Sequence, residues 1–109
     1  MSAEDNLKKY NITLPKATPP VGSYVAYRKI GNLLYISGQI SNDESGNLIK
    51  GKLGMDLNTQ DGYNAAVRCA LNIIAQAKTA CDEDLSKIKS CVKLTGFVNS
   101  SNDFIEQPK

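Results

Sequence analysis

Residues 21–40, VGSYVAYRKIGNLLYISGQI, decide the fold of this chain, because they contain two strand-like runs joined by Gly31-Asn32. Gly-Asn between two apolar runs indicates a two-residue hairpin turn, since glycine accepts the positive φ that such a turn requires. The sequence therefore predicts strands at residues 24–30 and 33–38. The second run is apolar almost without interruption, which predicts burial on both of its faces.

The second strand ends in Ser37-Gly38, a small hydroxyl beside a residue that has no side chain. This pair would let the backbone and the hydroxyl come close to a ligand or to another chain. The alternative is that Gly38 is a bulge or a strand end, and that the Ser37 hydroxyl is bonded within its own chain. The sequence leaves both interpretations open.

The segment 59–80 has the periodicity of an amphipathic helix. Asn58 or Thr59 is suited to cap it, and Asp61 in the first turn suits the positive end of the helix dipole. Steps of four and three residues predict one apolar face, formed by Tyr63, Val67, Ala70, Ile74 and Ala77. The polar residues expected on the solvent side are Arg68, Gln76 and Lys78.

The rest of the chain gives weaker signals on both sides of this helix. Residues 1–14 predict a short helix that packs on the edge of the domain, followed by an extended, proline-rich stretch. Residues 48–50 predict a short third strand, and residues 89–98, whose side chains alternate, predict another. Asn102 or Asp103 is suited to start a further helix. A helix that follows a hairpin must bury its apolar face on one side of the sheet, so the predicted fold class is α+β, a two-layer sandwich.

Composition bounds the class of protein. The length of 109 residues predicts a single domain over residues 1–109, with an N-terminal arm at 1–19, and the net charge of +2 is too small to indicate nucleic-acid binding. Histidine is absent, which excludes Ser-His and Cys-His nucleophile pairs and most zinc sites. Cys69, Cys81 and Cys91 are odd in number and widely spaced, so they predict no disulfide framework, and we expect a reducing, cytoplasmic location. No membrane-spanning run and no secretory signal are expected.

Four segments resemble the RidA/YjgF family of small trimeric proteins. The most specific is residues 31–40, GNLLYISGQI, and the Gly-Ser-Tyr of residues 22–24 precedes it. The others are the helix centre at residues 70–72 and the run at 84–104, which contains DLSKI and GFVN. The segment GFVNS, together with the final QPK, is more similar to a longer branch of this family, often labelled endoribonuclease L-PSP-like. The resemblance covers residues 20–109.

This resemblance implies a chorismate-mutase-like α+β fold, in which helices cover a mixed sheet. Three copies would pack sheet edge to sheet edge as a homotrimer, with ligand sites in the clefts between neighbours. The activity that it implies is hydrolysis of reactive enamine and imine intermediates, made by pyridoxal-phosphate enzymes, to a 2-oxo acid and ammonia. A water attacks the imine carbon, an arginine binds the substrate carboxylate, and no metal or organic cofactor takes part.

The resemblance assigns only part of a substrate site to this chain. Tyr24, Ser37 and Gly38 fall on positions that line the ligand cleft. The family's arginine matches neither Arg28 nor Arg68, because it belongs to a later strand. The catalytic residue is therefore left unassigned.

Other pocket residues of the family have no match here. Pro108 stands where the deaminase branch has an asparagine, and none of the cysteines falls on the pocket cysteine of the family. The resemblance also implies that a C-terminal helix and the closing strands, with the arginine, lie beyond Lys109. We therefore expect the 109-residue chain to be a poor catalyst by itself.

Two further functions remain open beside that of an imine or enamine deaminase. A trimeric protein that binds a small metabolite, or regulates a partner without catalysis, would agree with the absence of catalytic groups. An endoribonuclease would need general acid–base groups and a basic surface with interleaved aromatic side chains, and the sequence offers neither. Membranes and nucleic acids are not among the expected partners.

Overall fold

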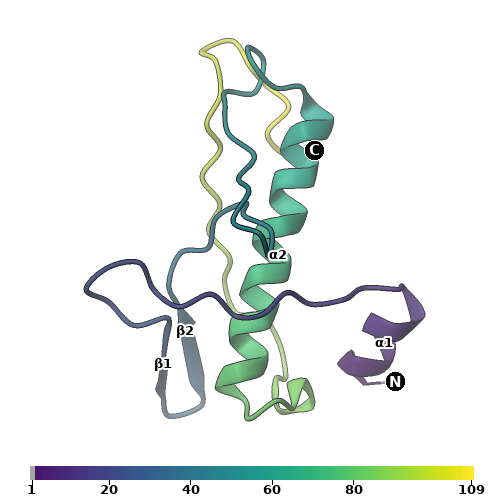
Figure 1. Ribbon diagram of the computed structural model, residues 1–109, viewed down its shortest axis with the longest axis vertical. Coiled ribbons are helices and arrows are strands. Elements are labelled where there is room, and N and C mark those ends of the chain that lie inside the picture. Colours follow the sequence, from purple (N-terminus) through teal and green to yellow (C-terminus); the bar gives the residue numbers. More distant parts are fainter. Residues whose placement is uncertain (1) are drawn as a thin grey trace.

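The computed structural model describes residues 2–109, and its longest element, α2 (Thr59–Ala80), is the axis on which the other segments pack (Figure 1). The hairpin of β1 (Tyr27–Ile30) and β2 (Leu33–Ile36) lies on one side of the C-terminal half of α2, and α1 (Ala3–Lys9) lies on the other side. A 3-10 turn, η1 (Leu85–Lys87), follows α2 and contacts α1. None of the helices within residues 2–109 has the length and hydropathy of a membrane span.

The β1–β2 hairpin confirms the turn predicted at Gly31, whose φ of +58° is left-handed. The two strands are antiparallel and shorter than predicted, since residues 24–26 and 37–38 lie outside the ladder. The predicted burial of β2 on both faces is wrong for this chain, because Tyr35 is 57% exposed and Leu33 is exposed as well. Helix α2 contacts β2, whereas no second layer covers the other face within residues 2–109.

Helix α2 has the bounds that the periodicity predicts, and a capping box explains its start. The Asn58 side chain accepts the N–H of Asp61 at 2.9 Å, and the Asp61 carboxylate accepts the N–H of Asn58 at 2.9 Å. At the other end Glu83, with a φ of +67°, donates its N–H to the Lys78 carbonyl at 2.9 Å. A left-handed residue that returns a hydrogen bond to the last turn ends a helix.

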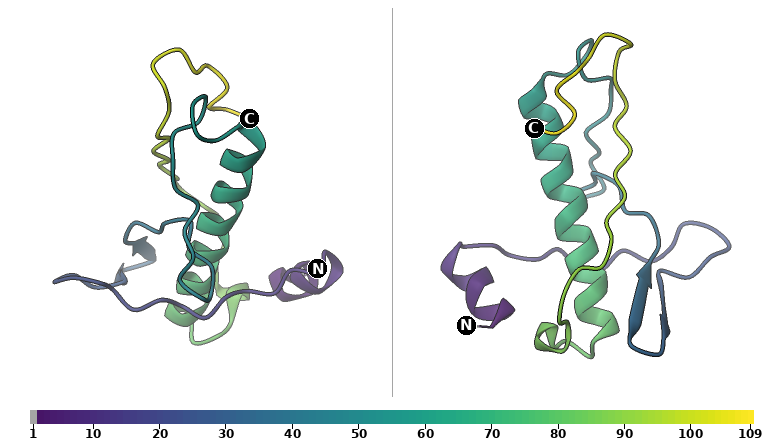
Figure 2. Two further views of the ribbon diagram at one scale, coloured as in Figure 1. Left: turned by 45° about the horizontal axis from the view of Figure 1, so that its top comes forward. Right: turned by 180° about the vertical axis from the view of Figure 1, so that it is seen from behind.

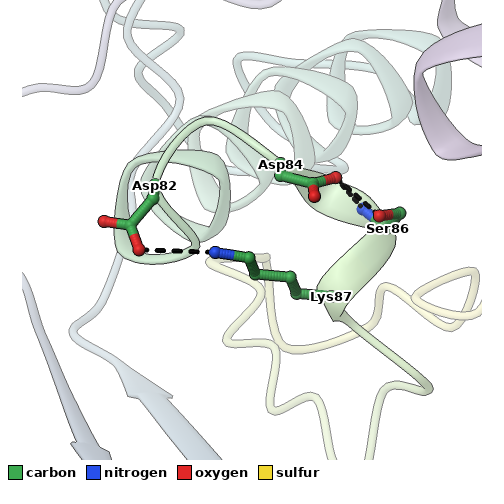
Figure 3. A network of polar contacts seen from close by, with 4 residues as sticks. All are labelled: Asp82, Asp84, Ser86 and Lys87. Atoms are coloured by element: carbon green, nitrogen blue, oxygen red, sulfur yellow. Dashed lines mark hydrogen bonds and ion pairs between the residues drawn. The ribbon is translucent and has the colours of Figure 1, made fainter.

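The acidic turn after α2 forms the polar network of Figure 3. Asp84 accepts the N–H of Ser86 at 3.0 Å and its hydroxyl at 2.6 Å, and so caps η1. The Ser86 hydroxyl, and then its N–H, hold the pKa of Asp84 below the ordinary value. Lys87 lies 3.4 Å from Asp82 in an exposed ion pair, which contributes little to stability.

The buried face of α2 differs from the predicted apolar face. Tyr63 and Val67 are exposed, whereas Gln76, predicted on the solvent side, is buried and Arg68 is half-buried. The physical reason is that the segments packed on this face present backbone carbonyls, which require amide donors rather than methyl groups. The buried apolar residues lie near the C-terminal end of α2 and in η1: Ala75, Ala77, Ala80, Cys81 and Leu85.

The two further strands and the last helix do not form as predicted. Residues 48–50 contribute only a bridge between Asn42 and Leu48. Residues 89–98 return along α2 in extended form (Figure 2), but within residues 2–109 no ladder pairs with them, and a strand requires a hydrogen-bonded neighbour. Asn102 and Asp103 lie in a turn, with no helix after them in the described chain.

Candidate functional site

Tyr24 lies in the bend that leads into β1, and its side chain is 48% exposed. Its hydroxyl accepts the N–H of Val21 at 3.4 Å, so the phenol is turned back onto its own loop. The ring lies beside Gly22, where an added Cβ would be 3.4 Å from Tyr24 Cε1. Because a tyrosine hydroxyl that accepts one bond still has its own proton, Tyr24 keeps a donor for a ligand.

Ser37 directly follows β2, and the chain itself satisfies its hydroxyl. Oγ donates to the Val25 carbonyl at 2.6 Å, and the Ser37 N–H donates to the Ala26 carbonyl at 2.9 Å. This agrees with the alternative of a bonded strand-end serine, although the Oγ lone pairs can still accept a proton from a ligand. Gly38 is exposed, and an added Cβ there would meet no heavy atom within 4 Å, so its own chain leaves the backbone open to approach.

The structure brings the two predicted parts of the site onto neighbouring segments. Tyr24 immediately precedes Val25, whose carbonyl accepts the Ser37 hydroxyl. No hydrogen bond joins the Tyr24 and Ser37 side chains within the described part of the chain. The two segments are therefore joined through the Val25 backbone carbonyl, next to the end of the hairpin ladder.

Of the two arginines, only Arg68 is engaged by side-chain hydrogen bonds within the described residues. Arg28 is exposed on β1, where it pairs with Tyr35 in the ladder register. Arg68 on α2 donates from Nη1 to the Asn47 carbonyl at 3.2 Å and to the Ser41 carbonyl at 3.5 Å. Its guanidinium therefore binds the loop before α2, and this contact also corrects its predicted position on the solvent side.

The cysteines and acidic groups of the described residues form no metal cluster, and Cys69 is held in its thiol form. Burial raises the pKa of the Cys69 thiol, which disfavours the nucleophilic thiolate. Cys81 is buried and Cys91 is exposed. Across residues 2–109, no group of three or more potential metal ligands lies close together.

Two adjoining hollows lie elsewhere, between the N-terminal arm, the loop at residues 42–46 and α2. Their volumes are about 170 and 240 Å³, and their shared lining is Pro15, Asn42, Asp43, Glu44 and Asn72. The Asn47 N–H, with smaller contributions from Ser45 and Arg68, lowers the pKa of Asp43 at the rim. Neither of these two hollows includes Tyr24, Ser37 or Gly38, and Tyr24 and Gly38 are exposed in the single chain.

Sequence reasoning missed two buried amides of α2 that hold the segments around this site. Asn72 Nδ2 donates to the Ile40 carbonyl at 2.9 Å, and Gln76 Nε2 donates to the Thr18 carbonyl at 2.7 Å. The available signal was their spacing of four residues, which places both on one helix face. Hydropathy alone assigned Gln76 to the solvent side and gave no signal for Asn72.

Three comparisons place these observations among known proteins. A model of the family described as "YjgF/chorismate mutase-like, putative endoribonuclease" matches residues 4–109. Protein TCP17 of Trypanosoma cruzi is 41% identical over 102 residues, which cover 94% of this chain and 63% of that protein. A Dermatophagoides farinae protein named 2-iminobutanoate/2-iminopropanoate deaminase is 28% identical over 94 residues, or 85% of this chain and 63% of that protein.

A solved structure is similar to this chain in fold as well as in sequence. The crystal structure of a protein from Shewanella oneidensis, described as a "putative endoribonuclease", is 36% identical with a TM-score of 0.92, and the match covers 99% of this chain and 71% of that one. The present chain thus spans 63% of the length of both curated relatives. Tyr24, Ser37 and Gly38 all lie inside the residues that the family model matches.

Proposed function

This chain belongs to the YjgF/chorismate mutase-like (RidA/YjgF) family and has its α+β fold, and from this premise we propose that it hydrolyses reactive enamine or imine intermediates to a 2-oxo acid and ammonia. The observation that carries the proposal is the hydrogen bond from Ser37 to Val25, which joins the segment of Tyr24 to that of Ser37-Gly38. The relative named as a 2-iminobutanoate/2-iminopropanoate deaminase supports the substrate class.

The proposed reaction adds water to the C=N bond of a 2-imino acid. A C–O bond forms at the imine carbon while the nitrogen takes up one proton of the water. The proton of the new hydroxyl then passes to the nitrogen as well, and the C–N bond breaks to release ammonia and leave the carbonyl. The Tyr24 hydroxyl is suited to donate a hydrogen bond to the substrate, and Ser37 Oγ is suited to accept a hydrogen bond from the attacking water. Because imines hydrolyse readily, positioning of water and substrate supplies most of the acceleration required.

We place this site in a cleft between copies of the chain, three in the proposed assembly. Ligand sites are concave, whereas Tyr24 and Gly38 are exposed in the single chain, so another chain would supply the second wall. The hairpin residues that offer exposed apolar surface for such packing are Ile30, Leu33 and Tyr35. The proposal assigns no carboxylate anchor to Arg28 or Arg68.

The test is the rate of pyruvate formation from iminopyruvate generated in the assay by an amino-acid oxidase acting on alanine. The intact chain should exceed the spontaneous rate, and Tyr24→Phe and Ser37→Ala should each lower the acceleration by about tenfold, the value of one lost transition-state hydrogen bond. Tyr63→Phe is the matched control, since it removes an exposed tyrosine hydroxyl on α2, outside the hairpin. Ser37→Thr, which keeps the hydroxyl, should retain most of the acceleration, so that the loss in Ser37→Ala is assigned to the hydroxyl. A wild-type rate equal to the spontaneous rate contradicts the proposal.

One observation favours a second candidate, a protein that binds a small metabolite without turnover. The Arg68 guanidinium is bound to loop carbonyls and is not free to orient a carboxylate for attack, and the exposed surface around Tyr24 does not exclude water. Binding of pyruvate without acceleration of imine hydrolysis would support this candidate over the deaminase. Cleavage of RNA has no comparable support, because the chain contains no histidine and carries a net charge of only +2.

A further inference from the structure

The buried polar side chains of the described chain are two amides on α2, one turn apart. Asn72 is 4% exposed and Gln76 is 3% exposed. A polar group at such depth is costly unless it is hydrogen-bonded, and both amides donate to backbone carbonyls far away in the sequence. Neither bond belongs to the helix itself, so the amides act on the segments that cross α2.

Gln76 holds the N-terminal arm where the arm crosses α2 (Figure 1). Its 2.7 Å bond to the Thr18 carbonyl is the one hydrogen bond that involves residues 13–20 in the described chain. Pro19 and Pro20 follow Thr18, and their fixed φ makes the next part of the arm stiff. Residues 21–23 connect this stiff part to Tyr24, so the bond from Gln76 restrains the start of the segment that carries Tyr24.

Asn72 holds the segment that leaves β2. Its Nδ2 group lies 2.9 Å from the Ile40 carbonyl, 3.1 Å from the Asn42 carbonyl and 3.0 Å from Asn42 Oδ1. Only residues 38 and 39 separate Ser37 from Ile40. Within this short connection, Gln39 Nε2 donates to the Ser37 carbonyl at 3.0 Å, which further limits its conformations. The hairpin restrains Ser37-Gly38 from the N-terminal direction of the chain, and the Asn72 contact restrains it from the C-terminal direction.

From this geometry we infer that Asn72 and Gln76 are positioning residues, which set the separation between the Tyr24 segment and the Ser37-Gly38 segment. The inference rests on the proposed function, because it concerns the same site. A rigid helix carries both donors, and four residues of helix correspond to about 6 Å along its axis. The segments bonded by these two amides, residues 13–20 and 37–40, contain no helix or strand. Hydrogen bonds from α2 therefore fix their positions, as a strand ladder would in a sheet.

The test removes each donor at nearly constant volume, with Gln76→Met and Asn72→Leu. The matched control is Gln60→Met on the same helix, whose exposed amide bonds only to Asn64. The first two variants should raise the KM for iminopyruvate about tenfold, the scale of a site displaced by a fraction of an ångström, and the control should stay within about twofold. A purely structural role would lower the folded fraction, and hence the apparent kcat, without a change in KM.

A second readout does not require turnover. The chain contains five tyrosines, so fluorotyrosine labelling gives five lines that Tyr→Phe variants assign. Gln76→Met should shift or broaden the Tyr24 line and leave the Tyr63 line on α2 unchanged, whereas Gln60→Met should change neither. In the wild type, pyruvate should move the Tyr24 line, and both donor variants should weaken that response about tenfold.

The outcomes separate this inference from the proposed function. No acceleration by the wild type refutes the deaminase, and weaker pyruvate binding in both donor variants but not in Gln60→Met then still supports the positioning role. An unchanged KM and an unchanged Tyr24 line in both donor variants overturn the positioning role, even if the wild type is active. The absence of any response of the Tyr24 line to pyruvate in the wild type overturns it as well.

Discussion

At Gly54, both the backbone conformation and the close packing of the C-terminal segment disfavour a side chain. Its φ is +85°, and an added Cβ would lie 2.6 Å from Ser101 Oγ and 3.2 Å from Phe104 Cδ1. A side chain in this conformation costs about 1–2 kcal/mol, and displacement of the C-terminal segment adds to it. We expect Gly54→Ala to lower the free energy of unfolding by about 2–3 kcal/mol in a urea titration.

Gly46 is the control at this scale, because its φ of +83° is nearly the same while its added Cβ would meet no heavy atom within 4 Å. Gly46→Ala should cost about 1–2 kcal/mol, the backbone contribution alone. Equal losses at the two glycines would show that the contact of residues 101–104 with Gly54 contributes nothing.

At the scale of the element, α2 depends on its first turn, where the capping box satisfies two backbone donors. Asn58→Ala removes the acceptor for the Asp61 N–H, and we expect it to lower the free energy of unfolding by about 1 kcal/mol, measured by circular dichroism during urea unfolding. Asn64→Ala is the control, because its exposed side chain accepts only from Gln60, within the same helix. A loss at Asn64 as large as that at Asn58 would contradict a special role for the cap.

At the scale of the whole molecule, the core lies where α1, η1 and the C-terminal end of α2 meet, and the long return segment at residues 89–98 contributes little to it. Leu85 is 5% exposed, whereas Phe97 is 95% exposed. Leu85→Ala should lower the free energy of unfolding by about 2–4 kcal/mol, since it empties a packed position. Phe97→Ala should change it by less than about 0.5 kcal/mol in the same urea titration. A larger effect at Phe97 would place part of the core along the return segment.

Local chemistry made several parts of this fold predictable from the sequence. Gly31-Asn32 predicted the hairpin turn, and Asn58 with Asp61 predicted the start of α2, because caps and turns involve residues that are neighbours in the chain. The family's α+β fold was predictable as well, from the resemblance of residues 31–40 and the other segments to the family whose model matches residues 4–109. For Tyr24, Ser37 and Gly38 the sequence supplied the candidates, and their role in binding stays a prediction.

Strand pairing and burial could not be derived in the same way, because they depend on partners that are distant in the sequence. Residues 89–98 alternate as a strand does, but alternation does not supply a ladder. Hydropathy predicts that Gln76 faces solvent. It is buried instead, because the Thr18 carbonyl, 58 residues away in the sequence, lies on that face of the helix and accepts its hydrogen bond. The sequence by itself determined the turn, the helix and the family, which follow from neighbouring residues. Only the tertiary structure decided which helix face is buried and what it holds, because a buried amide is stable only where a distant segment brings its acceptor.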